Sequence, residues 1–580
     1  MNRRHFFGAL AALPLTAYAQ EGPPVPDPVE KMTAPPQPRI AISHVGFRRR
    51  IGRKTVVVRA TGPTSPKSCT LRDVVEVKFR ITRPLAAERS DFGPCLTAEF
   101  DLDRQALYQI TAGDERSIQF AVDDDVWRRT MTKAFGYYRF QRCGVEVPGV
   151  HPACHLDDAR RRDTGEHVDV VGGWHDAGDL RKWMEVTMLN GIALLNLYQN
   201  NPEPRPADPT RQQILDEVKF GNTYFLKMQD SDGKIWADAA GGVNGDNSDN
   251  HWTDNVVGTA DDRYINPKKR SGTAAVFATL QGLVGQCYAQ SEPDYARRCL
   301  EAGVRAWKAF PEPPQATQDI AWWAMAACEL YRATRDEDFR RRAYLLGRRL
   351  LELQNTSFIA DQRQVRGFWM NGAQPYMDVV DSALPPLALL ELHSAFPDAE
   401  DRTKWLDAVR LYLDEYVLPM STRNAYRIMP LGVFVGSPTP ETYRPLAGRL
   451  TYRYFHPVRK QFWWQGANCH LASHALVLGR AFTLTEKRDY VDLAYRQLEW
   501  IMGANPFAAC MMTGEGMRNP YPHSRFIGLI PGGIMNGIAG NMQDEPVLDM
   551  HNTLDWRTCE YWSPHVAFYI WANSVLENTA

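Results

Sequence analysis

The sequence predicts a mainly α-helical protein, in which a small β-sandwich precedes an (α/α)6 toroid. Two observations predict this fold. Short segments that alternate polar and apolar residues follow a Pro-rich leader. From Thr130 to the C-terminus, amphipathic helical segments recur, and long loops rich in Gly and Pro separate them. At 580 residues the chain is too long for one ordinary domain, which agrees with two folded units.

Residues 1–19 predict an export signal peptide. Arg3-Arg4 precede Phe6-Phe7 and an apolar stretch that ends in Ala17-Tyr18-Ala19, a small-x-small cleavage site. The Arg pair resembles a bacterial twin-arginine signal; an ordinary export signal that begins with two Arg is the alternative. The apolar stretch is too short to span a membrane, and no later segment is long and apolar enough. We therefore expect an exported protein, periplasmic or secreted, without a membrane span.

The mature chain divides by composition into three parts. Residues 20–38 are rich in Pro and predict a disordered leader. Residues 39–128 predict the β-sandwich, with strands at Thr55–Arg59, Val75–Arg80 and Ser117–Val122. Residues 129–580 predict the helical domain.

About twelve helical segments follow the sandwich, and their number and pairing favour the toroid. In such a fold the long loops on one face form a cleft. The expected helices are Met131–Gln141, Glu185–Gln199, Thr210–Gln229, Gly272–Ala289, Tyr295–Ala309, Asp319–Thr334, Phe339–Leu353, Ser382–Ala395, Arg402–Tyr416, Cys469–Leu484, Tyr490–Met502 and Tyr561–Leu576.

Composition narrows the class of ligand. The net charge is −1, and the chain has neither basic blocks nor an RNA-type aromatic motif, so nucleic acid is not an expected partner. Hydrophobic residues make up 44% of the chain, enough for a large core. Sixteen Trp and 23 Tyr suit a protein that binds flat, partly apolar ligands such as sugars, although a large helical core also uses aromatic residues.

The most informative segment is Gly172-Gly173-Trp174-His175-Asp176-Ala177-Gly178-Asp179. It holds two carboxylates three residues apart in a turn shaped by glycines, which adopt backbone conformations that other residues resist. Two acids held close together are what a water-activating site requires, and a Trp beside them offers a stacking surface for a sugar ring. A solvated surface turn is the alternative.

Several motifs in the same order resemble glycoside hydrolase family 9. Residues 173–179 resemble its Asp-Ala-Gly-Asp signature, and 135–144 resemble the first helix of its catalytic domain. His151-Pro152-Ala153-Cys154-His155 resembles members that carry an N-terminal immunoglobulin-like domain. Residues 513–525 resemble a substrate-binding His/Arg loop, and 555–560 the segment with the catalytic acid. The resemblance covers nearly all of the mature chain and implies an immunoglobulin-like sandwich before the toroid.

The resemblance implies the roles of three carboxyl groups. Inverting hydrolysis requires an acid that protonates the leaving oxygen and a base that activates water. The two carboxyl groups are about 6.5–9.5 Å apart. Asp179 is expected to be the general base, with Asp176 positioning the same water. Glu560 is expected to be the general acid, because neighbouring aromatic residues would keep it protonated; a helix-start Glu is the alternative.

Substrate contacts are expected from a loop and from aromatic side chains. His523 and Arg525 are candidates to bind sugar hydroxyls, unless they are ordinary surface residues. The loop-borne Trp252 and Trp369 are the favoured stacking platforms, although any single Trp can instead belong to the core. The other candidates are Trp463, Trp464, Trp556 and Trp562.

The family's metal-containing branch suggests a second role for the turn at residues 172–179. A His at the position of His175 joins two Cys and another His as zinc ligands in that branch, and Cys143, Cys154 and His155 match the others. Such a Cys2His2 set suits tetrahedral Zn²⁺, and four protein ligands make a structural site. A Cys143–Cys154 disulfide or unconnected residues are the alternatives. Twin-arginine export of a folded protein would let the thiolates bind metal before oxidation.

Calcium is a further expectation of the resemblance. One loop carries hard oxygen ligands, namely Asp246, Asn247, Asp249 and Asn250, and Asp261-Asp262 lie beyond it. A solvated acidic loop is at least an equal alternative. Elsewhere, Cys69 and Cys95 could pair within the sandwich. Most remaining cysteines are expected to be small buried apolar residues.

Departures from the family pattern leave the substrate open. The usual Asp and Asn run before Glu560 is missing, and Tyr561-Trp562-Ser563-Pro564 replaces small residues after it. An endo-acting β-1,4-glucanase is the primary expectation. The alternative is an exo-acting β-glucosidase or β-glucosaminidase on oligosaccharides, with aromatic bulk closing one end of the cleft. A carbohydrate-binding protein without activity would lack an acid or base, and a zinc hydrolase would need an open metal position.

Overall fold

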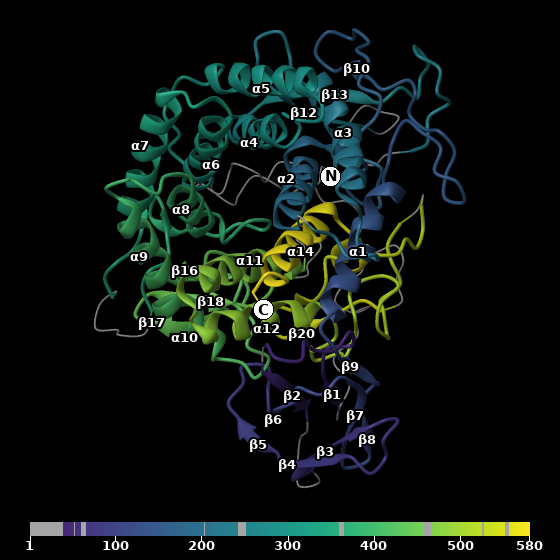
Figure 1. Ribbon diagram of the computed structural model, residues 1–580, viewed down its shortest axis with the longest axis vertical. Helices are drawn as coiled ribbons and strands as arrows, with labels where there is room; N and C mark the ends of the chain where they lie inside the picture. Colours follow the sequence, from purple (N-terminus) through teal and green to yellow (C-terminus); the bar gives the residue numbers. More distant parts are fainter. Residues whose placement is uncertain are drawn as a thin grey trace.

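The computed structural model places a small strand domain beside a larger ring of helices (Figure 1). It describes residues 39–579 apart from 52, 60–64, 202, 242–250, 359–364, 458–465, 525–526 and 551–555. The expected signal peptide (1–19) and Pro-rich leader (20–38) lie outside the described residues.

The N-terminal domain is a sandwich of two antiparallel sheets. One sheet has the order β1-β2-β6-β5; the other has the order β4-β3-β7-β8, with β9 also paired to β7. In β7, alternate residues point into the core, among them Tyr108 and Ile110. The strands are β1 (Arg39–Ala41), β2 (Lys54–Arg59), β3 (Ser68–Asp73), β4 (Arg80–Pro84), β5 (Ala86–Glu88), β6 (Cys95–Phe100), β7 (Ala106–Ala112), β8 (Glu115–Arg116) and β9 (Phe120–Val122). The expected sandwich is confirmed.

The strand expected at Val75–Arg80 is not formed, so this prediction is wrong. Residues 75–79 form the turn between β3 and β4, and Val75 is 83% exposed. The carboxylate of Asp73 accepts hydrogen bonds from the backbone N–H groups of Val75 and Glu76. This Asx-type turn ends the strand despite the alternating pattern that follows. Cys69, in β3, and Cys95, in β6, are both free, so the expected pairing is not formed.

Within the described ranges, twelve helices form the toroid. An inner ring consists of α2 (Met184–Asn200), α4 (Ser271–Cys287), α6 (Thr317–Thr334), α8 (Leu384–Ala395), α11 (Asn468–Thr485) and α14 (Ser563–Leu576). Each packs on the next, and α14 closes the ring against α2. The outer helices are α1 (Val126–Phe140), α3 (Arg211–Lys227), α5 (Pro293–Lys308), α7 (Glu337–Leu353), α9 (Arg402–Tyr412) and α12 (Arg488–Ile501). Figure 1 shows α5, α7 and α9 outside α4, α6 and α8. The expected (α/α)6 toroid is confirmed.

The N-terminal ends of the inner helices gather at one mouth of the ring. Trp183, just before α2, lies 6.4 Å from Trp562, just before α14, measured between ring centroids. Gln318, at the start of α6, donates a hydrogen bond to Asp381, just before α8. Because helix N-termini carry unpaired backbone N–H groups and a partial positive charge, this mouth is suited to polar ligands and carboxylates.

Short elements line the loops between the helices. A four-stranded sheet, in the order β10-β13-β12-β11, leads into α2 and α4. Its strands are β10 (Arg160–Arg161), β11 (Lys182–Trp183), β12 (Trp236–Ala240) and β13 (Tyr264–Lys269). The others are β14 (Met370–Asn371), β15 (Gln374–Pro375), η2 (Leu413–Val417), α10 (Leu418–Ser421), β16 (Gly432–Val435), β17 (Arg444–Ala447), β18 (Leu450–Arg453), β19 (Ala539–Gly540), β20 (Pro546–Val547) and α13 (Trp556–Cys559).

The sandwich docks on the helical domain through buried polar contacts. The backbone N–H of His44 donates to the carbonyl of Met502 (2.7 Å), and His44 Nδ1 accepts from the N–H of Met517 (3.2 Å). Burial at this interface lowers the pKa of His44 to about 4. The change from strands to helices lies between β9 and α1, so α1 starts before the expected boundary at 128/129. Trp127 accordingly packs in the helical core.

Candidate active site

The Asp176–Asp179 turn is held by the end of α1. The N–H of His175 donates to the carbonyl of Gln141 (2.8 Å), and Gln141 Nε2 donates to the carbonyl of Ala177 (3.2 Å). Within the turn, the N–H of Asp176 donates to the carbonyl of Arg181 (2.7 Å). A Cβ at Gly178 would overlap the carbonyl oxygen of His523, so only glycine allows this close approach. The turn is therefore rigid and in contact with the His523 loop.

A buried ion cluster braces the turn from behind. Asp158 pairs with Lys182 (2.6 Å) and with Arg263 (2.5 Å), and all three side chains are fully buried. Arg263 also donates to the carbonyl of Leu180 (2.7 Å), directly after the turn. Burial alone would raise the pKa of Asp158, but the charges of Arg263 and Lys182 lower it to about 2. The sequence interpretation missed this cluster, whose members come from three separate segments.

The segment with Glu560 lies against the same turn. Ala177 and Trp562 form an antiparallel bridge, and the N–H of Ser563 donates to the carbonyl of Asp176 (2.7 Å). The N–H of His523 donates to the carbonyl of Cys559 (3.1 Å). The structure thus brings the three expected catalytic carboxyls into neighbouring segments, although more than 380 positions separate Asp176 from Trp562 in the chain.

The two turn carboxylates have different surroundings. Asp176 is 3% exposed, and its Oδ2 accepts a hydrogen bond from the indole Nε1 of Trp562 (3.0 Å). Asp179 is only half-buried, and its Oδ1 accepts from the N–H of Arg181 (3.2 Å). Glu560 is 6% exposed and lies between α13 (Trp556–Cys559) and the final inner helix, α14. The turn therefore presents two unequal carboxylates: that of Asp179 is the more accessible, and that of Asp176 is enclosed.

The expected substrate-binding residues have mixed positions. His523 lies beside Gly178, as described, and Trp556 is partly exposed in α13, just before Glu560. Arg525, Trp463 and Trp464 lie outside the described residues. Trp252 is partly exposed, but one side of its ring stacks on His155 at 5.7 Å, so it covers the metal-ligand group.

Trp369 is not a stacking platform. Its ring is 2% exposed in the core, and its Nε1 donates to the carbonyl of Leu350 in α7 (2.9 Å). The expectation of an exposed loop Trp was wrong, because the loop folds back against the outer helices α7 and α9. Trp562 is 3% exposed and likewise lacks an open face.

A polar pocket adjoins the turn at the mouth of the ring. Arg181 ion-pairs with Asp238 and stacks over Trp183 at 4.4 Å. Glu185 faces Arg270 at 3.9 Å, and burial raises the pKa of Glu185 to about 7. The sequence interpretation missed this pocket, although Arg181 and Lys182 directly follow the acidic turn. It is lined by Arg181, Trp183, Glu185, Ala237, Asp238, Asn266, Lys268, Arg270 and Thr273.

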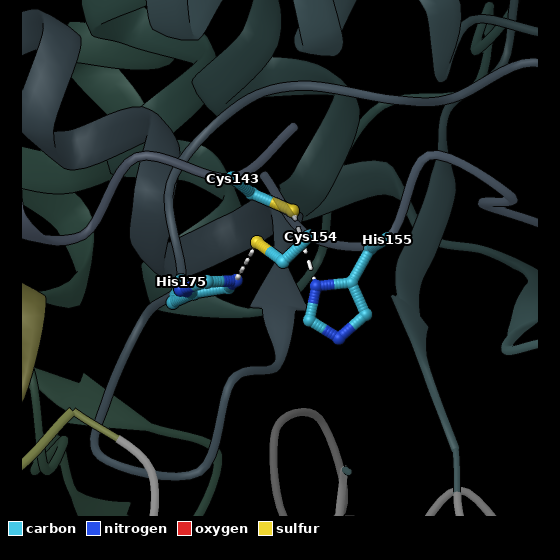
Figure 2. A group of neighbouring side chains, drawn as sticks. All are labelled: Cys143, Cys154, His155 and His175. Atoms are coloured by element: carbon cyan, nitrogen blue, oxygen red, sulfur yellow. Dashed lines mark hydrogen bonds between the residues drawn. The ribbon is translucent and has the colours of Figure 1, made fainter. Parts of the chain in front are cut away.

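The four expected metal ligands are gathered in one buried group, which Figure 2 shows. Cys143, Cys154, His155 and His175 each offer one atom, and these atoms lie within 4.8 Å of one another. Cys143 Sγ is 3.6 Å from His155 Nδ1, and Cys154 Sγ is 3.9 Å from His175 Nε2. Ligand atoms of a tetrahedral zinc site are about 3.4–3.8 Å apart.

Further details of the group fit a metal centre. His155 Nε2 contacts the carbonyl of His251 at 3.0 Å, which would orient the ring as in many metal sites. Burial opposes ionisation of the Cys143 thiol, but a hydrogen bond from Cys154 and the charge of Lys182 lower its pKa well below the usual value. Both cysteines are free, so the alternative disulfide is not formed.

A second group has only oxygen ligands. Carboxylate atoms of Asp157, Asp261 and Asp262 lie within 4.8 Å of one another. Asp157 Oδ2 is buried without a hydrogen-bond partner, and burial raises the pKa of Asp157. Arg160 already pairs with Asp262 (2.9 Å). Four of the expected calcium ligands, Asp246, Asn247, Asp249 and Asn250, lie outside the described residues.

Comparison with known proteins identifies the helical domain. Residues 127–532 match the sequence profile of glycosyl hydrolase family 9. A cellodextrinase of Butyrivibrio fibrisolvens is 23% identical over 492 residues, which are 77% of this chain and 80% of that protein. A cellulose 1,4-beta-cellobiosidase of Acetivibrio thermocellus is 23% identical over 90% of this chain, which spans only 63% of that protein. Endoglucanase C of Cellulomonas fimi is 23% identical over 84% of this chain, which spans only 45% of that protein.

Solved structures share the fold at low sequence identity. A metagenome-derived glycoside hydrolase family 9 endoglucanase aligns with a TM-score of 0.71 at 21% identity, covering 93% of this chain and 99% of that one. A zinc-binding triple mutant of the family 9 endoglucanase J30 aligns with a TM-score of 0.69 at 23% identity. The alignment covers 92% of this chain and 99% of that one. Across the described ranges, no helix has the length and apolar character needed to cross a bilayer.

Proposed function

Because the chain belongs to glycosyl hydrolase family 9, and is thus a glycoside hydrolase, we propose that it cleaves β-1,4-linked glucan with inversion. The relatives named cellodextrinase, cellobiosidase and endoglucanase support this substrate class. One observation carries the proposal: the bridge between Ala177 and Trp562, which puts the Glu560 segment against the turn with Asp176 and Asp179.

In the proposed reaction, Asp179 is the general base. It is the more accessible turn carboxylate, and its oxygen is oriented by the N–H of Arg181. It removes a proton from water as the water attacks the anomeric carbon. Asp176, enclosed and hydrogen-bonded, positions the same water from the other end of the turn.

Glu560 is the proposed general acid. It donates a proton to the glycosidic oxygen as that bond breaks, so that the leaving sugar departs with a hydroxyl group. Its 6% exposure and its place between Cys559 and Tyr561, both fully buried, favour the protonated form before reaction. His523 and Trp556 lie next to this centre and are proposed to bind sugar, with Arg525 as a further candidate.

The mode of attack has two candidates. An endo-acting β-1,4-glucanase is the primary one. An exo-acting β-glucosidase or β-glucosaminidase on oligosaccharides is the second, favoured by the similarity to a cellodextrinase over 80% of that protein. The expected aromatic bulk does not favour the exo mode, because Tyr561 and Trp562 are buried and not at an open end.

We also propose that Cys143, Cys154, His155 and His175 hold a structural zinc ion. Two thiols and two imidazoles supply a complete tetrahedral set, which leaves no position for substrate. The ion would brace the turn, since His175 directly precedes Asp176. Asp157, Asp261 and Asp262 are a weaker candidate set for calcium. Export to the periplasm or medium is proposed on the Arg3-Arg4 signal alone.

Variants of the carboxyl groups test the proposed roles. Asp179→Asn and Glu560→Gln should each lower kcat on cello-oligosaccharides by about a hundredfold or more, because proton transfer is lost. Asp169→Asn, a surface carboxylate paired with Lys227, is the matched control and should keep the wild-type rate. Circular dichroism establishes folding of each variant. Wild-type rates in folded Asp179→Asn would exclude the assignment of the base.

Product profiles over time separate the two modes of attack. Barley glucan, cello-oligosaccharides and chitosan oligosaccharides serve as substrates. Mixed oligosaccharides from barley glucan indicate endo attack, whereas a single sugar released from chain ends indicates exo attack.

A further inference from the structure

The indole of Trp562 donates a side-chain hydrogen bond to Asp176. Its indole Nε1 lies 3.0 Å from Asp176 Oδ2, and both residues are 3% exposed. An indole N–H only donates, and an ionised carboxylate only accepts, so this contact fixes the orientation of the Asp176 carboxylate. A donor to a buried charged acceptor is also among the stronger hydrogen bonds.

The backbone of the same residue fixes the ring. The N–H of Trp562 donates to the carbonyl of Ile534 (3.1 Å), and the next N–H, from Ser563, donates to the carbonyl of Asp176 (2.7 Å). Together with the bridge between Ala177 and Trp562, these bonds hold the segment between the turn and Ile534. The backbone that carries the ring is therefore fixed against the turn.

The ring is also enclosed by neighbouring side chains. Its centroid is 6.4 Å from that of Trp183 and 5.5 Å from that of His565. His565 Nε2 contacts Asn536 Oδ1 (2.8 Å), and the N–H of Asn536 donates to the carbonyl of Glu560 (2.8 Å). The contacts that enclose the indole are therefore continuous with those that hold Glu560.

We propose that Trp562 is a positioning residue, which orients Asp176 and links the carboxylates of the turn to the general acid two positions away. The proposal rests on the proposed function, in which Asp176 positions the attacking water. Because one short segment carries both Glu560 and the donor to Asp176, the acid and the turn are held at a fixed separation. Inverting hydrolysis depends on such a separation.

Trp562→Phe removes the donor and keeps an aromatic ring. We expect kcat to fall about tenfold or more with little change in KM, because a hydrogen bond to a charged group is lost. Trp369→Phe is the matched control: it loses an indole bond to a carbonyl in the outer core and should keep the wild-type kcat and KM.

A second replacement separates the hydrogen bond from packing. Benzothienylalanine at position 562 keeps the shape of indole and has no N–H, so it should show the same loss of kcat with the same small change in KM. Wild-type kcat in this variant would overturn the inference. Asp176→Asn is measured in parallel. If it retains wild-type activity, the proposed function of Asp176 fails; if it is inactive while both Trp562 variants match wild type, only the Trp562 inference fails.

Discussion

The buried ion cluster behind the turn predicts a large loss of stability in Asp158→Asn. This variant keeps the side-chain shape but removes the negative charge that Arg263 and Lys182 share. Those two cations would remain fully buried after losing the negative charge that they share. Because Arg263 also holds the carbonyl of Leu180, the exit of the Asp176–Asp179 turn should loosen as well.

The magnitude follows from the pKa of Asp158. A shift from 3.8 to about 2 corresponds to about 2.4 kcal/mol, at about 1.36 kcal/mol per pKa unit. Breaking a buried pair by removing one partner typically costs about 3–5 kcal/mol. We therefore expect the free energy of unfolding to fall by about 3 kcal/mol at pH 7. Since the folded pKa is depressed, this contribution is present above about pH 4 and is lost as the pH falls towards 2.

Urea denaturation followed by circular dichroism measures the loss. Asp163→Asn is the control, because Asp163 makes a comparable pair with Arg161 at the surface and should leave the unfolding midpoint unchanged. The gap between wild type and Asp158→Asn should narrow as the pH approaches 2. A loss below about 1 kcal/mol at pH 7 would refute the view that the cluster braces the turn.

Two further predictions concern the domain interface and the metal group. Burial lowers the pKa of His44 from 6.5 to about 4. The free energy of unfolding therefore falls as the pH drops from about 6.5 towards 4. In His44→Gln, the fall between pH 7 and pH 5 should be smaller by about 2 kcal/mol. Unfolding curves at both pH values measure it, and an unchanged pH dependence would argue against a neutral, buried His44. The native protein should contain one zinc per chain, and chelation should lower Tm before it changes kcat. Metal analysis should find zinc lost in Cys154→Ser and kept in Cys299→Ala; native protein without zinc would exclude the site.

Local patterns in the sequence predicted the helices and pointed to the segments that carry the candidate carboxyl groups. The inner and outer helices have regular apolar periodicity, so each expected helix overlaps an observed one. The turn at Gly172–Asp179 carries its glycines and acids in one short run. By contrast, the segment Val75–Arg80 has a strand-like pattern, but the side chain of Asp73 forms a turn there. A local hydrogen bond overrode the alternation.

Contacts between distant segments were beyond prediction from a single sequence. Asp158 and Arg263 are 105 positions apart, and Trp562 and Asp176 are 386 apart. Neither pair leaves a periodic signal. Trp369 and Trp252 were placed on loops correctly, but whether a loop Trp faces solvent depends on where the loop packs. Trp369 packs on α7, and Trp252 packs on His155.

The anomeric configuration of the first product tests the central claim most directly. Proton NMR of a fresh digest of cello-oligosaccharides follows the anomeric signals before mutarotation. If Asp179 activates water on the face opposite Glu560, the newly formed reducing end appears first as the α-anomer. A first product in the β configuration would require retention, and would contradict the roles assigned to the turn and to Glu560.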